Sequence, residues 1–183
     1  MSRTGFAILM AAIVVLVLGG MWIAWRARAR RDGGLAGASL MPTGEIVAVF
    51  PRASYVSTTP VGSPFERIAI PGLRYKGFAE VTVRRGGVTI AVTGEPPVHL
   101  SVDQLTGTAT AGGRIGKVVE QDGLSLLQWR PEPQTPAAAG SAPAPRTLES
   151  SFRFAAPPEQ QAFADAIATI VTTDQTDTTQ EDA

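Results

Sequence analysis

The sequence AEVTVRRGGVTIAV, residues 79–92, predicts a β-hairpin. Apolar residues alternate with polar ones from Ala79 to Val83, and the alternation resumes after the pair Gly86-Gly87. A period of two places the apolar side chains on one face of a strand, and adjacent glycines permit the positive φ angles that tight turns require. We therefore expect two antiparallel strands joined at the glycine pair.

Similar alternation lies on both sides of this hairpin. It predicts strands at residues 46–50, 98–102 and 124–130. The dipeptide Asp122-Gly123 is typical of a type I′ turn, so we expect residues 116–120 to pair with residues 124–130 as a second hairpin.

The end of the chain changes from strand to helix periodicity. Leu148, Phe152 and Phe154 share one face of a predicted last strand. After Pro157-Pro158 the apolar residues follow the helical spacing i, i+3, i+4, i+7, i+8, which predicts one amphipathic helix. These residues are Phe163, Ala166, Ile167, Ile170 and Val171.

The order of these elements indicates a mainly β, α+β domain over residues 44–171. About seven antiparallel strands precede one closing helix. A small sheet of this kind leaves an open end with exposed apolar side chains, which a terminal amphipathic helix can cover. We therefore expect a seven-stranded barrel or sandwich like that of pleckstrin-homology (PH) domains.

Three segments lack the pattern of a packed core. Residues 32–43 are rich in glycine and predict a flexible tether. Residues 131–146, with five prolines, predict a disordered insertion. Residues 172–183 are polar and acidic and predict a disordered tail.

An uncharged apolar stretch, residues 5–25, lies near the amino terminus. As a helix its 21 residues would extend about 31 Å, close to the thickness of a bilayer core. Residues 1–31 are therefore predicted to form a transmembrane anchor with a basic flank. Trp22 and Trp25 would lie at the interface, beside the basic flank formed by Arg26, Arg28, Arg30 and Arg31.

These arginines also predict the orientation of the anchor. Positive charge stays on the cytoplasmic side, so we expect the N-terminus outside and the domain in the cytoplasm, at the inner (plasma) membrane. A cleaved signal peptide is the alternative, because Ala27-Arg28-Ala29 has the small-x-small form of a cleavage site. The surrounding basic cluster opposes translocation and favours the anchor.

The net charge and the lack of cysteine exclude several classes of function. The formal net charge is zero, which gives no reason to expect nucleic acid as a partner. The chain has no cysteine, so disulfides and thiolate metal sites are excluded. We expect no cofactor.

These features together resemble a bacterial, mostly actinobacterial, group of single-pass membrane proteins with a PH-like domain, often labelled only as membrane or export proteins. The resemblance rests on the N-terminal anchor, the glycine-containing segments Gly116–Val119 and Gly123–Trp129, the aromatic strand Ser151–Phe154 and the final helix. It covers most of residues 44–171 and implies no catalytic residues.

Residue patterns that could carry chemistry favour ordinary structural roles. Gly112–Lys117 lacks the first glycine and the final Ser or Thr of a phosphate loop, and no helix pattern follows, so we expect a glycine turn entering a strand. His99, the only histidine, shares its predicted face with Ser101 and Asp103, a pattern that exposed polar alternation explains without a catalytic triad. No carboxylate and histidine spacing predicts a metal site.

The segment Arg74-Tyr75-Lys76 is the candidate contact for a lipid or a protein partner. It places two cations around an aromatic residue in a predicted loop. In PH-like domains, basic loops of this kind can bind anionic headgroups, although ordinary solvated surface also accounts for it.

The sequence therefore predicts a non-enzymatic module, anchored at the inner membrane, that docks a protein partner or an anionic lipid. An accessory subunit of a membrane transport or export complex is the alternative. A hydrolase that uses His99 is the third hypothesis.

Overall fold

The computed structural model describes residues 10, 12–24, 35–36, 40–115, 117–133 and 147–180. Residues 12–24 are helical, and Trp22 within them is exposed. Among the described residues, no helix has both the length and the apolar character needed to cross a bilayer. Both ends of the predicted span lie outside the described residues, and so do Trp25 and the arginines at 26, 28, 30 and 31. The same holds for residues 134–146 of the predicted insertion.

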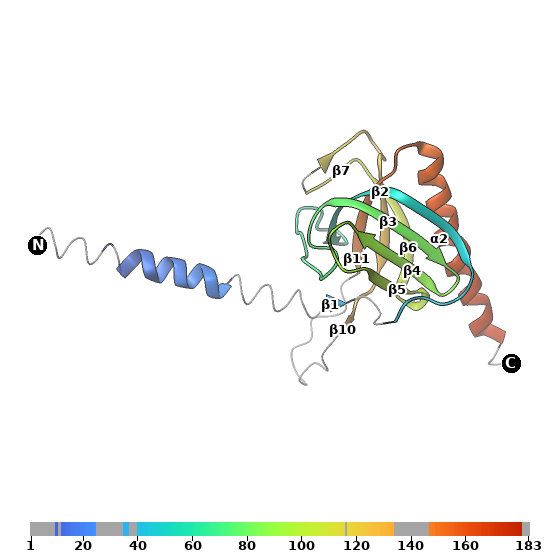
Figure 1. Cartoon of the computed structure of the whole chain (residues 1–183), viewed down its shortest axis with the longest axis horizontal. Coiled ribbons are helices and arrows are strands. Elements are labelled where there is room, and N and C mark those ends of the chain that lie inside the picture. Colours follow the sequence, from blue (N-terminus) through green and yellow to red (C-terminus); the bar gives the residue numbers. More distant parts are fainter. Residues whose placement is uncertain are drawn as a thin grey trace, which may run out of the picture.

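Seven antiparallel strands form the main sheet, as the sequence predicts. They are β2 (Ile46–Pro60), β3 (Gly77–Arg84), β4 (Gly87–Val92), β5 (Val98–Ser101), β6 (Leu105–Ala111), β9 (Leu124–Trp129) and β11 (Leu148–Arg153). Their spatial order is β5-β4-β3-β2-β11-β9-β6, with a short 3₁₀ helix, Val102–Gln104, between β5 and β6. Figure 1 shows these strands wrapped around one core, with α2 (Pro157–Gln180) along one side.

Strand β2 joins the two halves of the sheet. Its first part pairs with β3 from Ile46 to Tyr55, and its last part pairs with β11 from Ser54 to Pro60. The register shifts within β2 after Phe50 and again opposite Phe152. Such bulges increase the local bend and twist of a strand, which lets β2 serve both halves of a closed fold.

The β3–β4 hairpin is confirmed, with a small correction to its turn. Arg84 pairs with Gly87, so the turn residues are Arg85 and Gly86. Gly87 instead opens β4 with a φ of 142°, and a Cβ added there would lie 2.0 Å from the carbonyl oxygen of Leu100. Only glycine allows β4 and β5 to approach this closely.

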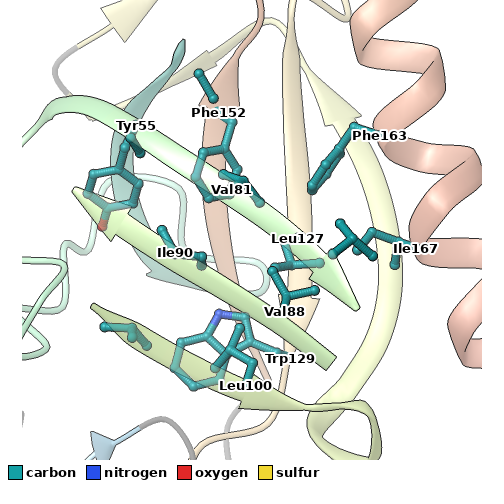
Figure 2. Packing of buried hydrophobic residues seen from close by; sticks show 14 of the residues in the cluster. Tyr55, Val81, Val88, Ile90, Leu100, Leu127, Trp129, Phe152, Phe163 and Ile167 are labelled. Carbon is teal, nitrogen blue, oxygen red and sulfur yellow. The ribbon is translucent and has the colours of Figure 1, made fainter. Parts of the chain in front are cut away.

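Helix α2 covers the open end of the sheet with the predicted apolar stripe. The ring of Phe163 lies 5.1 Å from that of Phe154 and 5.6 Å from that of Phe50, measured between centroids. Phe163 and Ile167 are completely buried, and Figure 2 shows both side chains pointing from α2 toward the strands. Burying a Phe or Ile side chain stabilises the fold by about 1.5–3 kcal/mol, so the stripe fixes the helix on the sheet.

The predicted pairing of residues 116–120 with 124–130 is wrong. Strand β9 is flanked by β6 on one edge and β11 on the other, so neither edge is free for residues 116–120. Instead β7 (Gly113–Arg114) and β8 (Lys117–Val118) form a separate small hairpin within the β6–β9 connection. Asp122 still adopts the positive φ expected of a turn residue.

Two predicted irregular segments contain regular structure. Residues of the tether and of the insertion pair as β1 (Leu35–Ala36) and β10 (Glu132–Pro133). Helix α2 continues to Gln180 and so includes the first nine residues of the predicted tail. Once a helix is nucleated, each added residue gains a hydrogen bond without a new nucleation cost, so polar residues can extend it.

Candidate functional site: a basic pocket beside exposed aromatic residues

The predicted contact segment lies immediately before β3. Arg74, Tyr75 and Lys76 are all exposed, and Tyr75 exposes 69% of its surface. Lys76 lines a pocket of about 460 Å³ on the outer side of the sheet. The residues that line this pocket are Ser54, Tyr55, Val56, Lys76, Gly77, Phe78 and Lys117. We call it the basic pocket.

The basic pocket brings together the chain's two lysines. Lys76 comes from the β2–β3 loop and Lys117 from the β7–β8 hairpin, forty-one positions later in the sequence. The other fourteen basic residues are arginines, and none of those that the structure describes lines the pocket. No acidic residue within the described ranges lines it either, so the pocket favours a negatively charged ligand.

An exposed aromatic residue forms one wall of the basic pocket. Phe78 pairs with Ser54 across β2 and β3 and exposes 57% of its surface. The guanidinium carbon of Arg52 lies 5.0 Å from the centroid of the Phe78 ring, a cation–π arrangement. The contact helps to fix the ring beside the pocket.

Tyr55 contributes to the pocket wall but directs its hydroxyl group into the domain. The hydroxyl donates a hydrogen bond to the carbonyl oxygen of Leu73 at 3.0 Å and lies 2.9 Å from Thr58 Oγ1. Burial raises the pKa of Tyr55 to about 12, although the hydrogen bond with Thr58 and the charge of Arg67 act in the opposite direction. The Tyr55 hydroxyl is therefore a structural group.

Polar contacts hold the β7–β8 hairpin, and with it Lys117, against the outer face of the sheet. Arg114 Nη2 lies 2.6 Å from Glu149 Oε2, and Ile115 N donates to Pro64 O at 3.2 Å. The side chains of Arg114 and Glu149 are only 12% and 8% exposed, so their charges compensate each other away from most solvent. Gln128 also donates to Glu149 at 2.9 Å.

A second ion pair lies nearer the basic pocket. Both terminal nitrogens of Arg153 donate to the Glu120 carboxylate at 3.0 Å, and Arg153 pairs in register with the pocket residue Ser54. A hydrogen bond from its own backbone N–H and those from Arg153 lower the pKa of Glu120. The positive charge of Lys117 also contributes to this lowering, so Glu120 binds Arg153 directly and is an acidic neighbour of Lys117 outside the pocket lining.

The other sequence candidates have local structural roles. His99 Nδ1 lies 3.0 Å from Thr89 Oγ1, its partner across β4 and β5. The Ser101 hydroxyl donates to Gln104 Oε1 at 3.4 Å, within the turn that follows β5. Within the described parts of the chain, no group of three acidic or histidine side chains is placed to bind a metal ion.

Of the predicted contact residues Arg74, Tyr75 and Lys76, only Lys76 lines the basic pocket, and the pocket residues Phe78 and Lys117 were not predicted. One local signal pointed to Phe78, because the alternation of β3 places this apolar residue on the polar face with Glu80 and Thr82. No local signal connects Lys117 with Lys76, because the fold of the β6–β9 connection brings them together.

A larger pocket of about 640 Å³ lies toward the other end of β2. Glu66 and Arg130 both line it, together with Gln128 and Thr106. Its lining carries charges of both signs, so it lacks the single charge preference of the basic pocket.

The fold and the basic pocket define a small β domain closed by a C-terminal helix, with a surface suited to binding. The model of the family described as bacterial PH domain-like matches residues 39–168. The chain belongs to this family. PH-like domains are generally non-catalytic binding modules.

Other comparisons add little about function. No curated protein matches the chain significantly. Among solved structures, a chain of "The 8S snRNP Assembly Intermediate" is similar with a TM-score of 0.46 and 7% sequence identity. The similarity covers 75% of this chain and 90% of that one, and we infer nothing about partners from it.

Proposed function

We propose that this chain is a non-catalytic docking module, anchored at the inner membrane, whose PH-like domain binds a protein partner on the cytoplasmic side. One observation carries the docking proposal. The basic pocket combines both lysines with Phe78, and Tyr75 lies exposed in the same loop as Lys76. Exposed aromatic residues beside a concave, charged surface are typical of binding sites.

The anchor in this proposal is supported by the sequence. Residues 5–25 carry no charge, and four arginines follow within the next six residues. The arginines favour the cytoplasmic side, so residues 26–183 would remain inside the cell. Tethering would raise the effective concentration of the domain near membrane-associated partners, without any catalytic step.

Site-specific photo-crosslinking in cells tests the docking proposal. We would place p-benzoylphenylalanine at Tyr75 and, as a matched control, at Ile46, which is 48% exposed at the far end of β2. We expect a discrete crosslinked protein band from position 75, absent from position 46 and reduced when Phe78→Ala is added. Equal crosslinking from both positions, or none from position 75, would contradict docking at this surface.

The identity of the crosslinked protein also separates two functions. A soluble enzyme or scaffold supports the docking module, whereas a polytopic membrane protein supports an accessory subunit of a transport or export complex. Mass spectrometry of the band distinguishes them.

Protease treatment tests the topology. Protease added outside intact spheroplasts should leave the PH-like domain undigested, and detergent should expose it. Digestion without detergent, or a mature protein that begins near Asp32, would contradict the anchor and its orientation.

A further inference from the structure

We infer that the basic pocket recognises an acidic segment of the protein partner, with carboxylates held by Lys76 and Lys117 and an apolar side chain held against Phe78. This inference rests on the proposed docking function and specifies the chemistry of the partner. Such a segment presents negatively charged groups next to an apolar side chain, and the lining of the pocket is complementary to both.

The charge balance of the pocket supports an acidic ligand. Lys76 and Lys117 line it, and none of the other five lining residues that the structure describes is charged. The carboxylates of Glu120 and Glu149 lie outside the pocket lining and bind Arg153 and Arg114, and the charge of Lys117 also acts on Glu120. No carboxylate among the described lining residues therefore competes with an incoming acidic group inside the pocket.

The cations of the pocket are lysines and not arginines, which favours carboxylates on a flexible segment. Lysine carries a compact charge on a flexible stem, with three rotatable N–H donors, whereas arginine presents a planar fork that demands a matching geometry. Two lysines from separate loops can adjust to carboxylates at varied spacing. This adaptability suits a peptide segment whose acidic residues are not rigidly placed.

The shape of the pocket favours a protein segment over a bilayer surface. Residues of β2 and β3 line a hollow of about 460 Å³ that opens to solvent, with Lys76 of the β2–β3 loop and Lys117 of the β7–β8 hairpin at its margin. Phe78, which is 57% exposed, adds apolar contact area next to the lysines. A protruding side chain and its neighbours can enter such a hollow, whereas a flat headgroup layer contacts mainly the rim.

The small number of lysines allows a direct test with the full chain. Reductive ¹³C-dimethylation labels Lys76, Lys117 and the α-amino group, while preserving their charge. The full-length protein would be placed in nanodiscs of phosphatidylcholine and titrated with the acetylated, amidated pentapeptide Glu-Asp-Phe-Glu-Asp. The matched control peptide is Gln-Asn-Phe-Gln-Asn, which has nearly the same shape without the charges.

We expect saturable shifts of both lysine methyl signals with the acidic peptide and none with the neutral one. Lys76→Gln and Lys117→Gln should each weaken binding about tenfold, as loss of a charge-assisted hydrogen bond predicts. Arg85→Gln removes an exposed cation at the opposite end of β3 and should leave binding unchanged. Loss of binding in Lys76→Gln and Lys117→Gln but not in Arg85→Gln supports the inference.

Several outcomes would overturn it. These are no saturable shift, equal shifts with both peptides, or equal effects of inorganic phosphate at the same charge concentration. Shifts that occur only in nanodiscs containing phosphatidylglycerol would assign the pocket to anionic lipid instead. If position 75 crosslinks a partner regardless of lysine substitution, docking stands and the acidic segment is rejected.

Discussion

The Nη2 atom of Arg114 lies 2.6 Å from Oε2 of Glu149, which joins the β7–β8 hairpin to strand β11. Glu149 also accepts a hydrogen bond from Gln128 of β9, so one carboxylate links three segments of the domain. The hairpin carries Lys117, which lines the basic pocket, so this ion pair also helps to hold Lys117 in its place beside the sheet.

Removal of one partner of this ion pair should destabilise the domain. Glu149→Gln leaves the Arg114 charge uncompensated where only 12% of the side chain is exposed. We expect the free energy of unfolding to fall by roughly 3 kcal/mol. Urea denaturation measures it, with the double substitution Arg114→Met and Glu149→Leu as the control, which should be much less costly. A loss below about 0.5 kcal/mol in the single variant would show that the hairpin is not held by this pair.

The Glu120–Arg153 pair should position Lys117 for binding. Glu120→Gln with Arg153→Gln keeps the net charge but removes both hydrogen bonds, so we expect weaker binding of the acidic pentapeptide. Glu120→Arg with Arg153→Glu exchanges the charges and should restore most of the affinity. The Lys117 methyl signal reports both effects in the same titration. If the exchanged variant binds no better than the double glutamine variant, the pair has no positioning role.

Two adjacent serines of β11 should respond differently to substitution. Ser150 Oγ lies 2.9 Å from Thr58 Oγ1 and accepts a hydrogen bond from Trp129 Nε1 at 3.0 Å, whereas Ser151 Oγ is buried without a hydrogen-bond partner among the described residues. Ser150→Ala leaves buried polar groups unpaired and should cost about 1–3 kcal/mol. Ser151→Ala should be nearly neutral or stabilising. Equal losses in chemical denaturation would contradict this hydrogen-bond network.

The raised pKa of Tyr55 predicts a loss of stability at high pH. Burial raises this pKa from 10.0 to about 12, so the folded state holds its phenolic proton more tightly than the unfolded state does. The resulting stabilisation is complete below about pH 10 and disappears as the pH rises to about 12, by roughly 2–3 kcal/mol. Urea denaturation at pH 9 to 12 measures the change. Tyr55→Phe should flatten the profile over this range, and an unchanged slope would assign it to other groups.

Glycine should be essential at position 87 but not at position 94. Both have positive φ angles, 142° and 85°, so alanine is strained at either. A Cβ at position 87 would also lie 2.0 Å from Leu100 O, whereas nothing lies within 4 Å of one at position 94. We expect Gly94→Ala to cost about 1–2 kcal/mol and Gly87→Ala to cost clearly more, because β4 and β5 must separate. Thermal unfolding of both variants measures the difference, and equal losses would be inconsistent with the close approach.

The sequence by itself determined the features that depend on short-range periodicity. A period of two gave the β3–β4 hairpin and the last strand, and a period of 3.6 gave the stripe of Phe163, Ile167 and Ile170. These patterns are readable because each element must place its own apolar side chains on one side, whichever element covers them.

The tertiary structure alone decided which distant segments meet. Strand β9 pairs with β6 and β11, so neither of its edges is free for residues 116–120. The same choice places Lys117 beside Lys76, and Ser150 beside Thr58 and Trp129. No local pattern encodes these contacts, because each forms only when strands far apart in the chain share one core.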